Sequence, residues 1–362
     1  MTEKRYPVHY ANFICHFGNG ELLDYLNEIV LPAFTSHDAV RTFKNGRYFF
    51  DSVELVNLAR EPGTHELAIC GRFVKDMIVR SEQRWDSEAG TLVAETRNLE
   101  TAPSAVFVLL LASHKLIYLL ETASAPGLES FRATVANFLS VMRRSYIDNI
   151  ANRAKSGELT ESEQAQFVER DENGDPRQVT KSRLNELVGA AELEIVPLSN
   201  EETLRSFLQL FQKLQVATVR LVKPNSELDN DDFIEGFRDK SDAVGSRNST
   251  LSYRNPEGLI QEKVAEQLEI AAAEANTEIK LAGVDATGRS LRGSNNEFKI
   301  VSYLEAKPPE IPALAQRMFT MFRNLRKDGL IKTADANLSD QAAATLATLA
   351  VKVANDGHAD AQ

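Results

Sequence analysis

The chain has 362 residues, of which 43% are hydrophobic and 26% are charged, and its formal net charge is −11. This length exceeds what one hydrophobic core usually fills, so two domains are expected. The acidic balance argues against a uniformly basic nucleic-acid-binding protein, although a local basic patch is compatible with it. The only cysteines, Cys15 and Cys70, have no CxxC spacing, which argues against a disulfide framework and a zinc-cysteine site.

Two features of the sequence bear on its compartment. Residues 1–6 are charged and lack the apolar segment of a signal peptide. The longest apolar run, residues 105–112, is too short to span a bilayer and is predicted to be a buried strand. We therefore expect a cytoplasmic protein that makes no membrane contact.

Residues 1–150 are predicted to form an antiparallel β-rich domain with a covering helix. Apolar runs separated by short turn sequences are typical of an antiparallel sheet or partial barrel. A helix over residues 128–146 places apolar side chains at helical spacing, which suits it to cover one face of that sheet. The expected strands cover residues 8–17, 42–50, 53–58, 66–85, 91–97, 105–111 and 116–121.

The composition changes after this helix. Residues 151–186 are polar and charged and contain glycine and proline, which indicates an interdomain connection.

Residues 187–330 have an order of elements that points to an α+β domain. A strand over residues 193–198 is followed by a helix, a strand over 216–222, a polar loop, a helix over 258–275, and a hairpin of strands 278–281 and 297–304. This order resembles a split βαβ, ferredoxin-like module. Because both helices would lie on one face, the other face of the sheet is expected to be open to a ligand.

The last segment, residues 331–362, is predicted to be an alanine-rich terminal helix and a tail. Leu346, Leu349 and Val353 form a narrow apolar stripe along this helix. A stripe this thin would not hold the helix in place unless it docked on something. We therefore expect a homo-oligomer or a complex with a partner protein subunit.

Motifs for common enzyme classes are absent. The sequence has no GxxxxGK[ST], GxGxxG, GxSxG or HExxH pattern, which argues against P-loop hydrolysis, dinucleotide redox chemistry, α/β-hydrolase chemistry and common zinc sites. A weaker pattern remains in Asp285 followed by Glu305 and Lys307. In some nucleases, carboxylates in such a pattern hold a metal ion while the lysine stabilises charge at the phosphate. In a chain rich in Glu and Lys, chance also produces this triplet.

A nucleic-acid-binding face is the other candidate site. Alternation along the predicted strands places a set of cations and one aromatic ring on the polar side of the C-terminal sheet, where cations would pair with phosphates and the ring would stack on bases. These residues are Arg220, Lys280, Lys299 and Tyr303, with Tyr253 and Arg254 able to join them from a loop. Glu278, Glu297 and Glu305 share the face, so a plain solvated sheet remains the alternative.

The segments 193–198 and 220–225, with sequences LEIVPL and RLVKPN, resemble a bacterial family known mainly as a domain of unknown function. The resemblance extends over about residues 191–305. Members of that family occur among phage-defence and mobile-element genes, so the resemblance implies a host-defence context. It supplies no catalytic residues.

Three functions stay open on these grounds. The first is a nucleic-acid-binding or recognition subunit of an antiphage defence system, which would grip DNA or RNA through the sheet face. The second is a metal-dependent nuclease of such a system, which would need Mg²⁺; no cofactor is expected otherwise. The third is a non-catalytic protein-interaction scaffold, which suits the acidic net charge.

Overall fold

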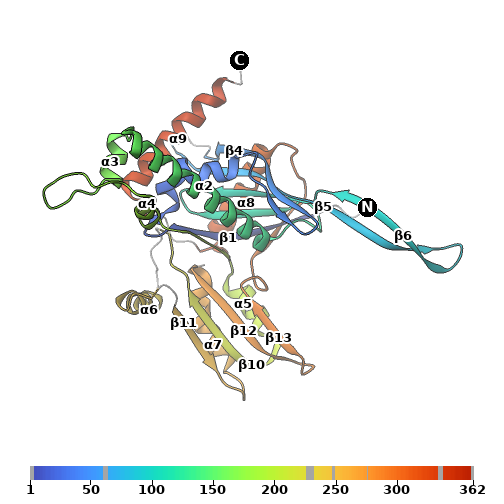
Figure 1. The fold of residues 1–362 in the computed structure, drawn as a ribbon. Coiled ribbons are helices and arrows are strands. Elements are labelled where there is room, and N and C mark those ends of the chain that lie inside the picture. The colour runs from blue at the N-terminus through green and yellow to red at the C-terminus, as the bar shows by residue number, and fades with distance from the viewer. Residues whose placement is uncertain are drawn as a thin grey trace.

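The computed structural model describes residues 4–59, 64–225, 232–246, 249–274, 276–332 and 337–359. It has a mixed α/β architecture built on two antiparallel sheets, and Figure 1 shows the smaller sheet below the larger one. None of the helices in these ranges combines the length and the apolar character needed to cross a bilayer.

The large sheet contains ten strands. These are β1 (Tyr6–Phe17), β2 (Gly20–Glu21), β3 (Arg41–Phe43), β4 (Gly46–Asn57), β5 (Leu67–Asp86), β6 (Thr91–Thr101), β7 (Ser104–Leu110), β8 (Lys115–Leu120), β9 (Ala191–Pro197) and β14 (Val301–Leu304). Its main path runs β14-β1-β8-β7-β5-β4-β3, while β2 and β9 pair with β1, and β6 pairs with β5. The predicted antiparallel sheet is therefore confirmed, although β9 and β14 join it from outside residues 1–150.

Helices cover both faces of the large sheet. One face packs against the long helix α2 (Leu128–Ser156), where the rings of Phe107 and Phe131 lie 5.3 Å apart in an aromatic core. The other face packs against α8 (Ile311–Lys327). The α2 side also receives η1 (Leu22–Tyr25), η2 (Leu26–Val30), α1 (Leu31–Thr35), α3 (Glu161–Phe167), α4 (Lys181–Val188) and α9 (Asp340–Ala359).

The small sheet has its own core. Its elements are α5 (Glu201–Leu208), β10 (Phe211–Leu221), α6 (Asp232–Ala243), β11 (Ser249–Arg254), α7 (Gln261–Glu274), β12 (Thr277–Asp285) and β13 (Ser290–Ser294). The strand order is β11-β10-β12-β13, and every neighbouring pair is antiparallel. Apolar residues of α5 and α7 cover one face. Within the described residues, α5 and α7 leave the opposite face of the small sheet uncovered.

The pairing of β9 and β14 differs from the ferredoxin-like sheet expected for residues 187–330. Both strands pair with β1, β9 along residues 11–17 and β14 along residues 6–9. The physical reason is that β1 is a long strand buried on both faces, whose backbone donors and acceptors need partners along its whole length. Only β10 to β13 make up the small sheet, and the bridge between Ser199 and Lys299 joins the two ends of this segment.

The terminal helix α9 docks on its own chain. Leu349 is 8% exposed in the core on the α2 side, and Leu346 and Val353 pack partly buried against the same core. The apolar stripe that led us to expect association through this helix is therefore covered within the monomer. If the protein forms a homo-oligomer or binds a partner subunit, it must do so through a surface other than this stripe.

Candidate functional site

The face of the small sheet that α5 and α7 leave uncovered is the candidate site, and we call it the open face. Along β10, Ala217, Val219 and Leu221 point to the helices, so the residues between them point outward. The strand registers place three rows across the sheet on this side. The rows are Arg254, Val216, Ala282, Arg292; then Ser252, Thr218, Lys280, Ser294; then Thr250, Arg220, Glu278.

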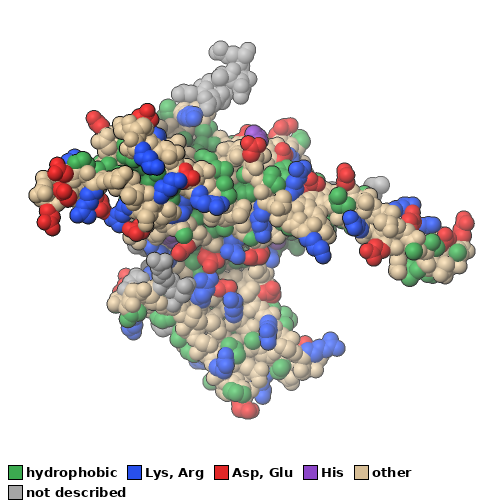
Figure 2. Space-filling model, viewed as in Figure 1, with side chains coloured by type: hydrophobic (Ala, Val, Ile, Leu, Met, Phe, Trp, Pro, Cys, Tyr) green, Lys and Arg blue, Asp and Glu red, His purple; other side chains and the backbone are tan. Residues whose placement is uncertain are grey.

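Positive charge predominates on these rows. They carry four cations and one carboxylate, Glu278, although the whole chain is acidic. Arg254 and Arg292 are exposed on the two edge strands, and neither forms an ion pair within the described residues. Figure 2 shows Lys and Arg side chains scattered over the small sheet on the side that faces the viewer. The open face is therefore a local basic patch.

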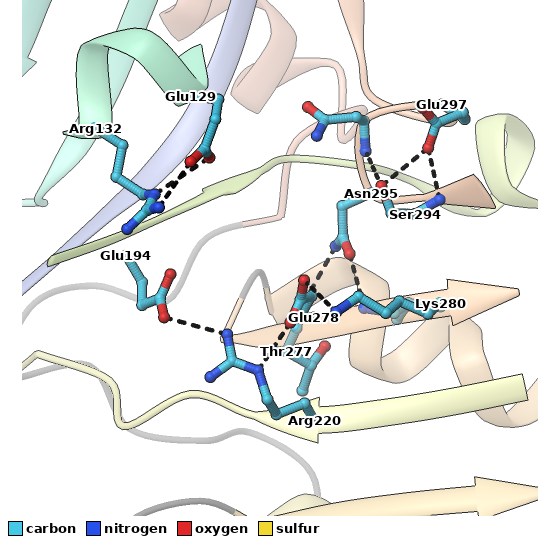
Figure 3. Close-up of polar contacts among 12 residues, drawn as sticks. Glu129, Arg132, Glu194, Arg220, Thr277, Glu278, Lys280, Ser294, Asn295 and Glu297 are labelled. Atoms are coloured by element: carbon cyan, nitrogen blue, oxygen red, sulfur yellow. Dashed lines mark hydrogen bonds and ion pairs between the residues drawn. The ribbon is translucent and has the colours of Figure 1, made fainter. Parts of the chain in front are cut away.

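An ion-pair cluster occupies the end of the open face nearest the large sheet (Figure 3). Arg220 donates from Nε to Glu278 at 2.8 Å and from Nη2 to Glu194 of β9 at 3.2 Å. Lys280 Nζ lies 3.0 Å from the other oxygen of Glu278. Burial alone would raise the pKa of Glu278, but the hydrogen bonds from Arg220 and Lys280 outweigh it and hold that pKa below its usual value. Glu278 therefore stays ionised and fixes the position of Arg220.

The two cations of this cluster differ in what they can still offer. The Arg220 side chain is 28% exposed and bound to two carboxylates, whereas the Lys280 side chain is 61% exposed. A long, exposed ammonium can turn toward an added anion at little cost. Lys280, Arg254 and Arg292 are thus the cations most able to contact a ligand.

Small side chains lie between the cations. Thr218 Oγ1 and Ser252 Oγ are 3.2 Å apart, and Val216 and Ala282 lie between the two edge arginines. A flat surface of hydroxyl groups and short side chains allows a rigid polyanion to approach the backbone closely. No aromatic ring lies on these rows in the described strands, because Tyr253 points to the helix side.

The four residues predicted to bind nucleic acid separate into two groups. Arg220 and Lys280 lie on the open face. Lys299 lies in the connection between the sheets, where its Nζ donates to the Asn296 carbonyl at 3.0 Å and burial lowers its pKa. Tyr303 lies on β14 in the large sheet, opposite Pro7. The structure therefore brings together two of the four.

The structure places two cations on the open face, Arg254 and Arg292, that the sequence did not identify as its main residues. Arg254 was expected in a loop, but it ends β11 and faces outward. Arg292 was missed because its segment was expected to be part of a loose turn. The alternation from Ser290 to Ser294, in which Leu291 points inward, was the signal that could have identified it.

The three nuclease candidates lie on different elements. Asp285 Oδ1 accepts hydrogen bonds from the Thr287 and Arg289 backbone in the β12–β13 turn. Lys307 pairs with Glu121 at the end of β8, and Glu305 lies 3.9 Å from Arg5. Across the described ranges, no cluster of three or more His, Cys, Asp or Glu residues could hold a metal ion.

No protein-family model matches the chain, and no curated protein matches it. The chemistry of the open face is therefore the basis for assigning a function.

Proposed function

We propose that the protein binds nucleic acid through the open face and that the sugar-phosphate backbone is what it contacts. The observation that carries this proposal is the concentration of four cations on one exposed sheet face of a protein with net charge −11. Phosphate groups pair with Arg and Lys in a way that does not depend on base sequence. Glu278 and Glu194 are both paired with Arg220, which leaves the more exposed Lys280, Arg254 and Arg292 to contact phosphates.

A duplex is the form of nucleic acid that suits this face. Proteins that bind single strands usually stack bases on aromatic rings, and the described rows of the open face have none. Arg254 and Arg292 stand on the two edge strands of the same row, so their Cα atoms are about 14 Å apart for strands spaced at about 4.8 Å. Two guanidinium groups at that separation can each reach a different backbone across a groove about 12 Å wide.

The family resemblance adds a setting to this activity. A protein that grips duplex backbone without reading sequence would serve as the recognition subunit of an antiphage defence system. The metal-dependent nuclease is outside the proposal because Asp285, Glu305 and Lys307 engage separate partners on separate elements.

Charge reversal on the open face tests the proposal. The double variant R254E/R292E removes the two cations that have no ion pair in the described residues and should weaken binding of a labelled duplex by at least about tenfold at low salt. Binding would be followed by fluorescence anisotropy with duplex DNA, duplex RNA and single strands.

A matched control separates the open face from general electrostatics. The variant R323E/K327E makes the same change in net charge on the exposed side of α8, away from the open face. It should bind nearly as well as the wild type. Loss of binding in this control, with binding kept in R254E/R292E, would move the site to α8 and refute the proposal.

A further inference from the structure

A two-stranded arm extends from the large sheet. Beyond Met77, β5 has only β6 as a neighbour, so residues 78–100 form a ribbon that leaves the body of the molecule (Figure 1). Its turn includes Gly90, whose φ of 62° is in the left-handed region that glycine tolerates. A two-stranded ribbon alone is at best marginally stable in water. The arm therefore gains stability if something packs on it.

One face of the arm carries most of its apolar side chains. Alternation along β5 places Val79, Ser81, Gln83 and Trp85 on this face, and the register places Leu99, Arg97, Ala94 and Leu92 beside them. Trp85 is 61% exposed, Leu92 60% and Leu99 65%. We call Val79, Trp85, Leu92, Ala94 and Leu99 the arm stripe. The arm stripe continues the side of β5 on which Phe73 is buried in the core. Side chains that alternate in the same way are therefore covered in the body of the sheet and exposed in the arm.

The other face of the arm carries charge. Arg84 binds Glu95 at 2.7 Å and Asp86 at 3.3 Å there. Over residues 78–100, three arginines stand against five acidic residues. This balance disfavours nucleic acid and anionic lipid as the partner of the arm, because both would be repelled. An apolar stripe on an acidic ribbon fits a protein surface.

The arrangement of the apolar side chains along the stripe indicates which protein binds there. Val79 and Leu99 form one apolar pair near the base, and Trp85 and Leu92 form a second pair near the tip, with small or polar residues between. If two arms stack face to face and antiparallel, a two-fold axis passes through the middle and the base pair of each arm meets the tip pair of the other. Arg97 near that axis is already paired with Glu95, so like charges do not face each other unpaired.

We propose that the arm stripe is a self-association surface and that two copies of this chain form a two-fold dimer through it. Residues 78–86 span about 30 Å, so two stacked arms bury roughly 700 Å² in total, which is below the usual range for stable complexes. The dimer therefore dissociates on dilution. This inference is independent of nucleic-acid binding.

Sedimentation analysis of the full chain between about 1 and 300 μM tests the dimer, since small interfaces give dissociation constants in this range. The wild type should shift from monomer to dimer. The variant L92K/L99K should raise the dissociation constant by roughly 100-fold, because each substitution enters a two-fold interface twice. The matched variant I78K/V93K, on the charged face, should behave as the wild type.

Cross-linking checks the geometry. Gln83→Cys places a thiol near the proposed axis, while Arg84→Cys places one on the opposite face, and the native Cys15 and Cys70 are both buried. A short bis-maleimide should cross-link the Gln83→Cys chain into a dimer and leave Arg84→Cys monomeric. A chain that stays monomeric over the whole range, or a dimer that L92K/L99K leaves intact, would overturn the proposal.

Discussion

Glu66 is a residue whose environment conflicts with its charge. Its carboxyl group is largely buried beside α8, and within the described residues its Oε1 accepts no hydrogen bond. Burial raises its pKa to about 7, although Arg326 and Arg323 act to lower it. Between pH 4.5, the ordinary pKa of a glutamate, and about pH 7, the carboxyl group is therefore mostly neutral in the folded protein and mostly charged in the unfolded chain.

This shift predicts how stability depends on pH. The folded-state pKa lies above the unfolded value, so Glu66 contributes stability fully below the unfolded pKa and loses it as the pH rises through about 7. Glu66→Gln cannot ionise and should therefore be more stable than the wild type by about 1–3 kcal/mol at pH 8, with little difference at pH 5. Urea unfolding at both pH values measures this.

The exposed loop residue Glu172 supplies the control. In Glu172→Gln, the free energy of unfolding should change between pH 5 and pH 8 by the same amount as in the wild type. A Glu66→Gln protein with unchanged pH dependence would show that the carboxyl group ionises normally in the folded state.

The element with the most demanding backbone is β1. β8 pairs with β1 only as far as Asn12, so the residues of β1 after Asn12 extend beyond β8. There the Asn225 side chain makes hydrogen bonds that a neighbouring strand would otherwise make. Asn225 Oδ1 accepts from the Cys15 N–H at 3.0 Å, and its Nδ2 donates to the Phe13 carbonyl at 3.1 Å. One side chain from the segment after β10 thus satisfies two buried backbone groups of β1.

Removing that side chain should destabilise the whole chain. Asn225→Ala leaves a buried N–H and a buried C=O without partners, which we expect to cost about 2–4 kcal/mol. Asn185→Ala removes an exposed hydrogen bond on α4 and should cost well under 1 kcal/mol. Equal midpoints of urea unfolding for the two variants would contradict the role assigned to Asn225.

The same element explains what the sequence could and could not predict. Local alternation identified the strands of the N-terminal region, the long strand now seen as β5 and the outward position of Arg220 and Lys280, because these depend on neighbours in the chain. Pairing depends on distant residues. Nothing in the periodicity of β9 or β14 shows that both join β1, whereas the alternation of residues 290–294 did carry the outward position of Arg292.

At the scale of the whole molecule, the small sheet is an insertion between β9 and β14. Ser199 and Lys299 are bridge partners, and the Ile300 N–H donates to the Leu198 carbonyl at 2.8 Å, so the insertion leaves and returns at one point. Its core of α5, α7 and the sheet is separate from the two cores of the large sheet. Each part therefore buries most of its own apolar residues, and only a small cluster of Ile14, Val196 and Val222 joins them among the described residues.

This arrangement predicts that the insertion can be removed. A chain that lacks residues 200–298, with Ser199 and Lys299 joined by a short glycine linker, should keep the large sheet folded, though less stable because contacts of Asn225 with β1 are lost. Circular dichroism and a cooperative thermal transition would report this. A shortened chain that fails to fold would mean that the large sheet needs the insertion for its own core.

Duplex binding through the cations of the open face is the central claim, and the salt dependence of that binding tests it most directly. If the three available cations, Lys280, Arg254 and Arg292, contact phosphates, a plot of log K against log salt for duplex DNA should have a slope near −2.7, about −0.9 for each contact. In R254E/R292E the magnitude of the slope should fall by about 1.8, because two contacts are lost. A wild-type slope near zero, or equal slopes in the two proteins, would contradict the claim.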